Sequence, residues 1–198
     1  MIALIDYRAG NLTSVRKAFA AIGAELFTPE APADLGEASA IVVPGVGHFG
    51  ATRALGQDWR DAIIERVGEG RPLLGICLGM QWLFEGSDEA ADLPGLGLLG
   101  GQCYRLKATG VKIPHVGWNS LDLQHEGTIA DGVAQGSQVY FTHSFVAPVT
   151  GDTVAVTEHG EPFAAIVQRG QVAGVQFHPE KSGDVGLQIL RNFLDMVG

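Results

Sequence analysis

Long apolar segments are absent from the sequence, which has 198 residues. The most apolar stretch, residues 72–84, is interrupted by Gln81, so no segment approaches the roughly 18 consecutive apolar residues of a membrane-spanning helix. The chain reaches Asp6 after only a few apolar residues and has no basic residue before them. We therefore expect neither a membrane anchor nor a secretory signal peptide.

Cysteine and basic residues are also scarce. Cys77 and Cys103 are the only two cysteines, which predicts free thiols in the reducing cytoplasm and not a disulfide scaffold. The 13 Lys and Arg residues against 22 Asp and Glu residues give a formal net charge of −9. A chain this acidic is a poor candidate for binding nucleic acid or an anionic membrane through its charge.

Hydrophobic residues make up 46% of the chain and charged residues 18%, so a buried core is expected. Glycine is abundant at 28 residues, about twice the average usage of roughly 7%, and it follows no fixed period. Many tight turns are predicted instead of a repeat array. No linker or low-complexity segment divides the chain, so residues 1–198 are predicted to form a single domain.

The hydrophobic pattern of the first half alternates between short apolar strands and amphipathic helices. The strands are predicted at residues 2–5, 24–28, 40–43 and 73–76, and the helices at 12–22, 59–67 and 78–84. Apolar strands that alternate with helices predict a parallel sheet covered on both faces. The second half has antiparallel character, with strands predicted at residues 95–106, 113–123, 138–141, 163–168 and 172–177 and a last helix up to Val197. The fold class is therefore α/β, a mostly parallel central sheet flanked by helices, with an antiparallel elaboration in the second half.

A reactive residue, Cys77, follows the apolar strand at 73–76 and opens a helix, with Gly75 and Gly79 two positions away on either side. This is the pattern of a nucleophile elbow with cysteine in place of serine. The free N–H groups of a helix N-terminus favour a thiolate there. A small buried cysteine at a strand end is the ordinary structural alternative.

A nucleophilic thiol needs a base and a group that orients the base. His178 and Glu180 follow the apolar strand at 172–177, and in an extended conformation they point to the same face. Pro179 disfavours a helical conformation at His178. Such His and Glu pairs are frequent on surfaces, but together with the cysteine elbow this pair indicates Cys-His-Glu catalysis.

The turn Pro44–Gly47 directly follows another predicted strand. The carboxyl ends of parallel strands share one edge of the sheet, so this turn is expected beside Cys77. Its N–H groups could stabilise a developing oxyanion. An ordinary strand-to-helix turn is the alternative, whereas a phosphate loop lacks its motif. A metal site made of Cys77, His178 and Glu180 lacks the usual ligand spacing.

Taken together, Gly75–Gln81 and Gln176–Glu180 resemble the corresponding segments of class I glutamine amidotransferases. The resemblance narrows to one family among them, the glutaminase subunits of imidazole glycerol phosphate synthase in histidine biosynthesis. The segments that carry this narrower resemblance occur in the family's order at residues 6–12, 44–50, 112–119, 140–145 and 181–183.

The resemblance implies that Cys77 attacks the side-chain amide of glutamine, that His178 transfers protons and that Glu180 orients His178. It also implies an oxyanion hole formed by the backbone N–H groups of Val46 and Leu78. The residues implied to bind glutamine are Gly47, Gln81, Glu89, His143, Ser144 and Phe145.

The resemblance further implies a separate cyclase subunit of (β/α)₈ barrel fold, which forms a heterodimer with this chain and receives ammonia through a channel. No cofactor and no metal are implied. Four residues match family segments near the interface: Asn11, Pro114, His115 and Trp118. The family usually has glycine at the position of Arg8, so arginine is strained there if its φ is positive.

Other functions remain open at the level of sequence. Another class I glutaminase subunit, serving anthranilate, aminodeoxychorismate or guanylate synthesis, would use the same triad with a different partner. A silent binding subunit would not need an intact triad. A cysteine hydrolase acting on γ-glutamyl peptides should work without a partner.

Overall fold

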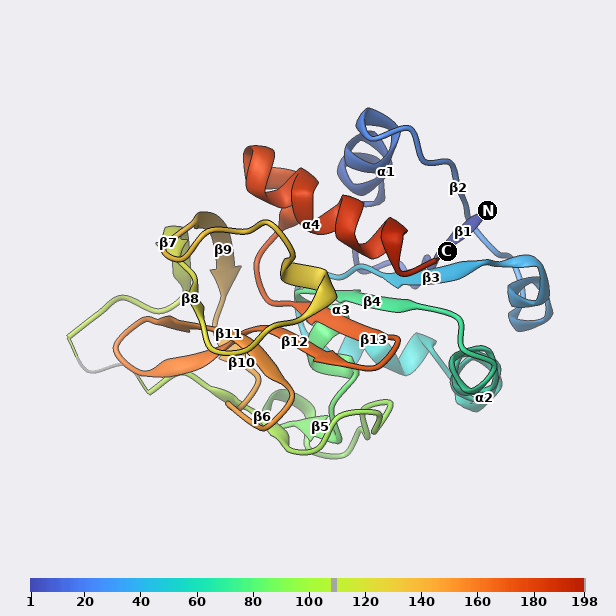
Figure 1. The fold of residues 1–198 in the computed structure, drawn as a ribbon. Coiled ribbons are helices and arrows are strands. Elements are labelled where there is room, and N and C mark those ends of the chain that lie inside the picture. Colours follow the sequence, from blue (N-terminus) through green and yellow to red (C-terminus); the bar gives the residue numbers. More distant parts are fainter. Residues whose placement is uncertain (108–109, 198) are drawn as a thin grey trace.

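The centre of the molecule is an eight-stranded sheet, seen in a computed structural model that describes residues 1–107 and 110–197 (Figure 1). Its strands lie in the order β2-β1-β3-β4-β13-β12-β11-β8. Their bounds are β1 (Ile2–Leu4), β2 (Leu26–Phe27), β3 (Ala40–Val43), β4 (Leu73–Ile76), β8 (Asp122–Leu123), β11 (Thr153–Glu158), β12 (Pro162–Arg169) and β13 (Val172–Val175).

The half of the sheet from β2 to β13 is parallel, and the half from β13 to β8 is antiparallel. Every residue of β1, β3, β4 and β13 is buried, as expected for strands that are covered on both faces. This arrangement confirms the predicted fold class.

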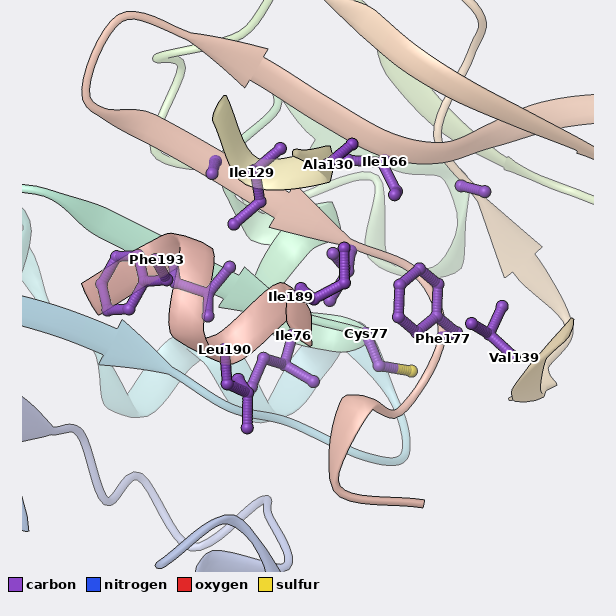
Figure 2. Packing of buried hydrophobic residues seen from close by; sticks show 14 of the residues in the cluster. Ile76, Cys77, Ile129, Ala130, Val139, Ile166, Phe177, Ile189, Leu190 and Phe193 are labelled. Carbon is purple, nitrogen blue, oxygen red and sulfur yellow. The ribbon is translucent and has the colours of Figure 1, made fainter. Parts of the chain in front are cut away.

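Helices cover both faces of the sheet, with α1 (Leu12–Ala21) and α4 (Gly183–Asp195) on one side and α2 (Gln57–Gly68) and α3 (Leu78–Trp82) on the other (Figure 1). Side chains alternate along each strand, so Leu4 packs with α1 and α4 whereas Ile5, directly after β1, packs with α2 and α3. Figure 2 shows Ile189, Leu190 and Phe193 of α4 in the first of these two layers.

Two smaller sheets lie outside the central one. The first contains β10 (Phe145–Val146), β6 (Gln102–Arg105) and β5 (Gly86–Ser87), and the second pairs β7 (His115–Ser120) with β9 (Gln138–His143). Short 3₁₀ helices connect the elements: η1 (Pro32–Glu37), η2 (Phe49–Ala54), η3 (Asp88–Ala90), η4 (Thr128–Ala130) and η5 (Pro179–Lys181). No helix in residues 1–107 and 110–197 is long and apolar enough to cross a membrane.

The second half differs from the prediction in its strand boundaries. The strand predicted at 95–106 exists only as β6, and the one predicted at 113–123 is divided at Leu121 into β7 and β8, which belong to different sheets. At Leu121 the backbone bonds to Gly136 and Ser137 of the neighbouring loop instead of continuing the ladder. The strands predicted at 163–168 and 172–177 pair as a hairpin, and Gly170 at its turn has the positive φ, 55°, that such turns require.

Candidate active site

Cys77 occupies the sharp turn between β4 and α3. Its backbone has φ 53° and ψ −107°, a conformation that non-glycine residues rarely adopt. Both flanking glycines are required by close packing. A Cβ at Gly75 would lie 2.6 Å from the carbonyl oxygen of Gly79, and a Cβ at Gly79 would overlap the carbonyl oxygen of Val43. The structure therefore has the nucleophile elbow that the glycine spacing indicates.

The sheet register brings His178 and Glu180 to this elbow. Val175 at the end of β13 pairs with Ile76 at the end of β4, and the Cys77 N–H donates to the carbonyl oxygen of Val175 over 2.8 Å. Nδ1 of His178 lies 2.8 Å from Oε1 of Glu180, and both side chains are 2% exposed. The structure thus brings Cys77, His178 and Glu180 together, although their sequence positions are far apart.

The electrostatics of His178 reflect both neighbours. Burial lowers the pKa of the imidazole, but the neighbouring Cys77 and Glu180 raise it to about 10. Nε2 of His178 has no hydrogen-bond partner among the described residues. The interaction between His178 and Cys77 is therefore electrostatic, and a protonated imidazole would stabilise negative charge on the sulfur.

The Pro44–Gly47 turn lies beside the elbow, as expected from the shared sheet edge. The Val46 N–H donates to the carbonyl oxygen of Ala9 over 3.1 Å, and the Leu78 N–H reaches the carbonyl oxygen of Gly45 over 3.4 Å. The two predicted oxyanion donors are therefore engaged with carbonyl groups of the chain itself. Rotation of the single Gly45–Val46 peptide would release both N–H groups.

Tyr7 holds the base of this turn and was not anticipated from the sequence. Its hydroxyl donates to the carbonyl oxygen of Pro44 over 2.7 Å. Burial raises the pKa of Tyr7, and the nearby Cys77 adds to the shift. The bond joins residues 37 positions apart, so no local sequence signal could have predicted it.

A cavity of about 250 Å³ opens beside the sulfur. This volume is below the roughly 300–1,000 Å³ of pockets for drug-sized ligands, so it suits a small metabolite. All the residues predicted to bind glutamine line the cavity: Gly47, Gln81, Glu89, His143, Ser144 and Phe145. The rest of the wall is formed by Cys77, Leu78, Pro114 and Thr142.

Several groups in the cavity wall are already oriented by hydrogen bonds. Oε2 of Glu89 accepts the Phe49 N–H over 2.6 Å, which fixes its carboxylate at the rim. Nε2 of Gln81 donates to the carbonyl oxygen of Phe145 over 2.8 Å. The negative carboxylate of Glu89 in the cavity wall matches the ammonium group of an α-amino acid.

His143 belongs to a buried histidine pair. Its Nε2 lies 3.1 Å from Nδ1 of His115, and the His115 ring stacks on His159 with ring centroids 4.0 Å apart. Burial, followed by the charge of His159, lowers the pKa of His115 to about 4. Burial, followed by the charge of His115, lowers the pKa of His143 to about 3. Both rings are therefore neutral at neutral pH.

The four predicted interface residues lie in different environments. Trp118 is 57% exposed and packs edge-on against Tyr140, whereas His115 is only 3% exposed. Pro114 lines the cavity, and Asn11 caps α1 by accepting the Ser14 N–H with its side chain. Exposure alone therefore supports a contact role for Trp118 more directly than for His115.

Three further residues had no predicted role. Arg8 has φ 63°, so the strain expected for arginine at this position is present. His48 caps η2 by accepting the Gly50 N–H over 2.9 Å. Cys103 is completely buried, and burial raises the pKa of its thiol, so it is a packing residue. Among the residues that the structure describes, no cluster of His, Cys, Asp or Glu side chains could hold a metal ion.

Comparison with known proteins shows similarity to glutamine amidotransferases over the whole chain. The family profile "Glutamine amidotransferase class-I" matches residues 3–197. "Imidazole glycerol phosphate synthase subunit HisH" of Bacillus cereus (strain B4264) is 43% identical, over 100% of this chain and 95% of that protein. The protein of the same name from Methanothermobacter thermautotrophicus is 40% identical, over 100% of this chain and 99% of its own length.

Solved structures support the fold. A chain described as "Crystal structure of glutamine amidotransferase" superposes with a TM-score of 0.79 at 23% identity, covering 100% of both chains. A chain of "Structure of PurLQS from Thermotoga maritima" superposes with a TM-score of 0.78 at 18% identity, covering 100% of this chain and 98% of its own. At these identities the likeness concerns the fold alone.

Proposed function

The chain belongs to the class I glutamine amidotransferases and, within them, to the HisH subunits of imidazole glycerol phosphate synthase, and from this premise we propose how its residues perform the reaction. It is a glutaminase subunit that hydrolyses L-glutamine to glutamate and ammonia. The ammonia serves the synthesis of imidazole glycerol phosphate and an aminoimidazole carboxamide ribotide in histidine biosynthesis.

The observation that carries the proposal is the position of Cys77. Cys77 is a non-glycine residue held at φ 53°, and beside it lies a buried pair in which His178 Nδ1 is 2.8 Å from Glu180 Oε1. Packing alone does not require this arrangement. Strained backbone at a nucleophile, together with a base and a group that orients the base, is the pattern of covalent acyl transfer.

The reaction runs through a thioester. The Cys77 sulfur attacks the side-chain carbonyl carbon of glutamine and forms a tetrahedral intermediate. His178 then protonates the amide nitrogen, and the carbon–nitrogen bond breaks. Ammonia departs, and the γ-glutamyl group remains on Cys77 as a thioester. Water, deprotonated by His178, attacks the thioester, and glutamate departs as the sulfur regains negative charge. Glu180 keeps the imidazole in the orientation that both steps require.

The oxyanion of each tetrahedral intermediate needs donors, and we assign these to the N–H groups of Val46 and Leu78. In the conformation described above both groups are bonded to carbonyl oxygens of the chain. Rotation of the Gly45–Val46 peptide would turn them toward the substrate. Loss of one such donor typically reduces the rate by about 10²–10³, so the isolated chain should be a slow glutaminase.

Substrate binding is assigned to the cavity beside Cys77. The carboxylate of Glu89 suits the ammonium group of glutamine. Ser144 and Phe145, which also line the cavity, are assigned to glutamine binding through the family. Gln81 and His143 complete the wall, and Gly47 leaves room for the substrate backbone. These assignments rest on the lining residues and on family membership.

The acceptor of ammonia is proposed to be a separate cyclase subunit of (β/α)₈ barrel fold that forms a heterodimer with this chain. Free ammonia in neutral water is mostly ammonium, which has no lone pair for attack, so a closed path between the two sites preserves reactivity. Trp118 and Val116, each 57% exposed on β7, offer an apolar contact surface. A cytoplasmic location is part of the same proposal and rests on two unpaired cysteines.

The test is glutamine hydrolysis by the complex of this chain with the barrel cyclase. Cys77→Ala should abolish glutamate release, whereas Cys103→Ala, which removes the other thiol, should retain it. Hydrolysis that survives Cys77→Ala would overturn the proposed function. Co-purification of a different synthase from the source cells would assign the chain to another amidotransferase.

A further inference from the structure

Gln176 lies directly beside the nucleophile, yet the reaction described above makes no use of its side chain. It follows β13 at the level where Cys77 follows β4, because Val175 and Ile76 are paired. The side chain is 0% exposed, and Nε2 lies 3.5 Å from Sγ of Cys77. A glutamine without access to solvent must satisfy its hydrogen bonds inside the protein, so this contact is specific.

The orientation of the Gln176 amide follows from a chain of hydrogen bonds. The carbonyl oxygen of Phe145 can only accept, so the Gln81 group that lies 2.8 Å away must be the NH₂. The same NH₂ lies 3.0 Å from the Gln176 side chain, whose facing atom must therefore be Oε1. The NH₂ of Gln176 then points the other way, to the sulfur. Reversing either amide would set two donors or two acceptors against each other.

We propose that Gln176 is a catalytic residue whose amide N–H donates a hydrogen bond to Cys77 Sγ and stabilises the sulfur whenever it is negatively charged. The proposal rests on the proposed function in taking Cys77 as the nucleophile. An amide cannot accept the thiol proton, so Gln176 acts separately from His178. It stabilises the thiolate before attack and again when the thioester breaks and the sulfur is the leaving group.

Other groups also act on the sulfur, and all of them stay in place when only residue 176 is changed. His178 faces Cys77 from the segment after β13, with Glu180 of η5 behind it. Tyr7 approaches from the loop after β1, and His143 of β9 acts on His178. A difference in Cys77 reactivity between the wild type and a Gln176 variant therefore reports on the side-chain amide of Gln176.

The experiment measures the rate at which iodoacetamide alkylates Cys77 in the full chain, as a function of pH, with the modified residue identified by peptide mass spectrometry. Gln176→Met removes the donor at similar volume. The alkylation rate at neutral pH should fall by about tenfold, because the thiolate loses the stabilisation that a hydrogen bond gives to a charged group. The profile should move to higher pH and rejoin the wild type where the thiol is ionised in both proteins.

Gln176→Glu gives a second arm. Its carboxylate would face the sulfur with a like charge, so the rate at neutral pH should fall further than in Gln176→Met. The matched control is Gln168→Met, because Gln168 of β12 bonds to the Ile129 N–H, and this variant should keep the wild-type profile. An unshifted profile in Gln176→Met, or a rate reduced equally at every pH, would overturn the proposal.

A measurement on the wild type covers the case in which the variants do not fold. The side-chain amide resonance of Gln176 should move with pH at the same midpoint as the alkylation profile, and the movement should disappear after Cys77 is alkylated. A resonance position that does not change with the ionisation or the alkylation of Cys77 would overturn the proposal. A wild-type complex that fails to hydrolyse glutamine would instead overturn the proposed function.

Discussion

Arg8 and Cys77 are non-glycine residues with positive φ, at 63° and 53°, and they differ in what holds them there. Cys77 is fixed by close packing around Gly75 and Gly79, and its strain presents the sulfur to the cavity. Arg8 is exposed, and its own N–H donates to the Asp6 side chain over 2.9 Å. The backbone strain at Cys77 therefore serves the proposed reaction, whereas the strain at Arg8 has no part in it.

Relief of the strain at Arg8 should stabilise the fold. Arg8→Gly is expected to raise the free energy of unfolding by about 0.5–1 kcal/mol, because glycine adopts positive φ without the steric cost. Arg8→Ala, which removes the same charge but keeps a Cβ, should leave it nearly unchanged. Urea denaturation measures both variants. Equal stabilities of the two variants would contradict this explanation.

The buried histidines predict acid sensitivity. The folded-state pKa values of about 4 for His115 and about 3 for His143 lie below the ordinary value of about 6.5. The unfolded chain thus binds protons that the folded chain does not as pH falls from about 6.5 toward 4, and the free energy of unfolding falls over that window. His178 acts in the opposite direction, since its raised pKa gives a contribution that is lost as pH rises toward about 10.

Urea denaturation between about pH 7 and pH 5 measures the acid side of this behaviour. His143→Phe removes the ring with the lower of these two pKa values, and the variant should lose less stability on acidification than the wild type. His125→Phe, a substitution of an exposed histidine, should keep the wild-type dependence. Identical pH dependence in all three proteins would argue against burial as the cause.

At the residue scale the sequence predicts what lies in short motifs and misses what depends on distant contacts. The elbow can be predicted from the local spacing of Gly75, Cys77 and Gly79. Gln176 could have been found, since it stands two residues before His178 and strand alternation places both on one face. Tyr7 could not, because its partner Pro44 is 37 positions away and nothing in the intervening residues marks the bond.

In the proposed mechanism, activity depends most closely on the Pro44–Gly47 turn, because its conformation decides where the Val46 N–H points. A Cβ at Gly45 would overlap the Tyr7 hydroxyl and lie 2.8 Å from Cβ of Leu78. The position thus requires glycine for close approach and not for a positive φ. The sequence predicted the place of this turn correctly, but it contains no signal for which carbonyl groups its N–H groups reach.

Gly45→Ala should move the turn away from the elbow. Glutamine hydrolysis by the complex is expected to fall by about 10²-fold or more, as for the loss of an oxyanion donor, while the KM for glutamine changes little. Gly36→Ala is the control, since a Cβ at Gly36 meets no atom within 4 Å. Steady-state kinetics test this expectation. Wild-type kcat in Gly45→Ala would show that the turn has no part in the transition state.

Secondary structure was predicted best where strands are continuous apolar runs. β1, β3 and β4 were found from such runs, whereas β11 and β5 were missed. β5 has only two residues, too few for a periodic signal, and β11 carries two threonines and a glutamate among its apolar residues. The order of strands in the sheet depends on long-range pairing, which hydrophobic periodicity does not encode.

The whole molecule is proposed to work as one half of a two-protein enzyme. That residues 1–198 form one domain remains a prediction, supported by the family match over residues 3–197. A separate partner was expected from the resemblance to glutaminase subunits of imidazole glycerol phosphate synthase. The residues that contact the partner stay a prediction; of the four named, His115 is buried, whereas the neighbouring Val116 is exposed.

Trp118 is the side chain on which partner binding is predicted to depend most. It is large, aromatic and 57% exposed, which is typical of residues that dominate an interface. Trp118→Ala should raise the dissociation constant for the barrel cyclase roughly tenfold or more and leave the melting temperature of the free chain unchanged. Isothermal titration calorimetry measures the effect.

The matched control for this interface is Ile64→Ala, which truncates an apolar side chain of α2 that is 40% exposed. α2 packs on the sheet face opposite α1 and α4, and the control should bind the cyclase as the wild type does. Equal weakening by both substitutions would argue against β7 as the contact surface.

The central claim is that Cys77 becomes acylated by the γ-carbonyl of glutamine. Acid quenching of the complex during turnover, followed by peptide mass spectrometry, tests it most directly. We predict a γ-glutamyl group on the peptide that contains Cys77, present only when glutamine is supplied. A complex that releases glutamate while Cys77 stays unmodified, or carries the group at Cys103, would contradict the account.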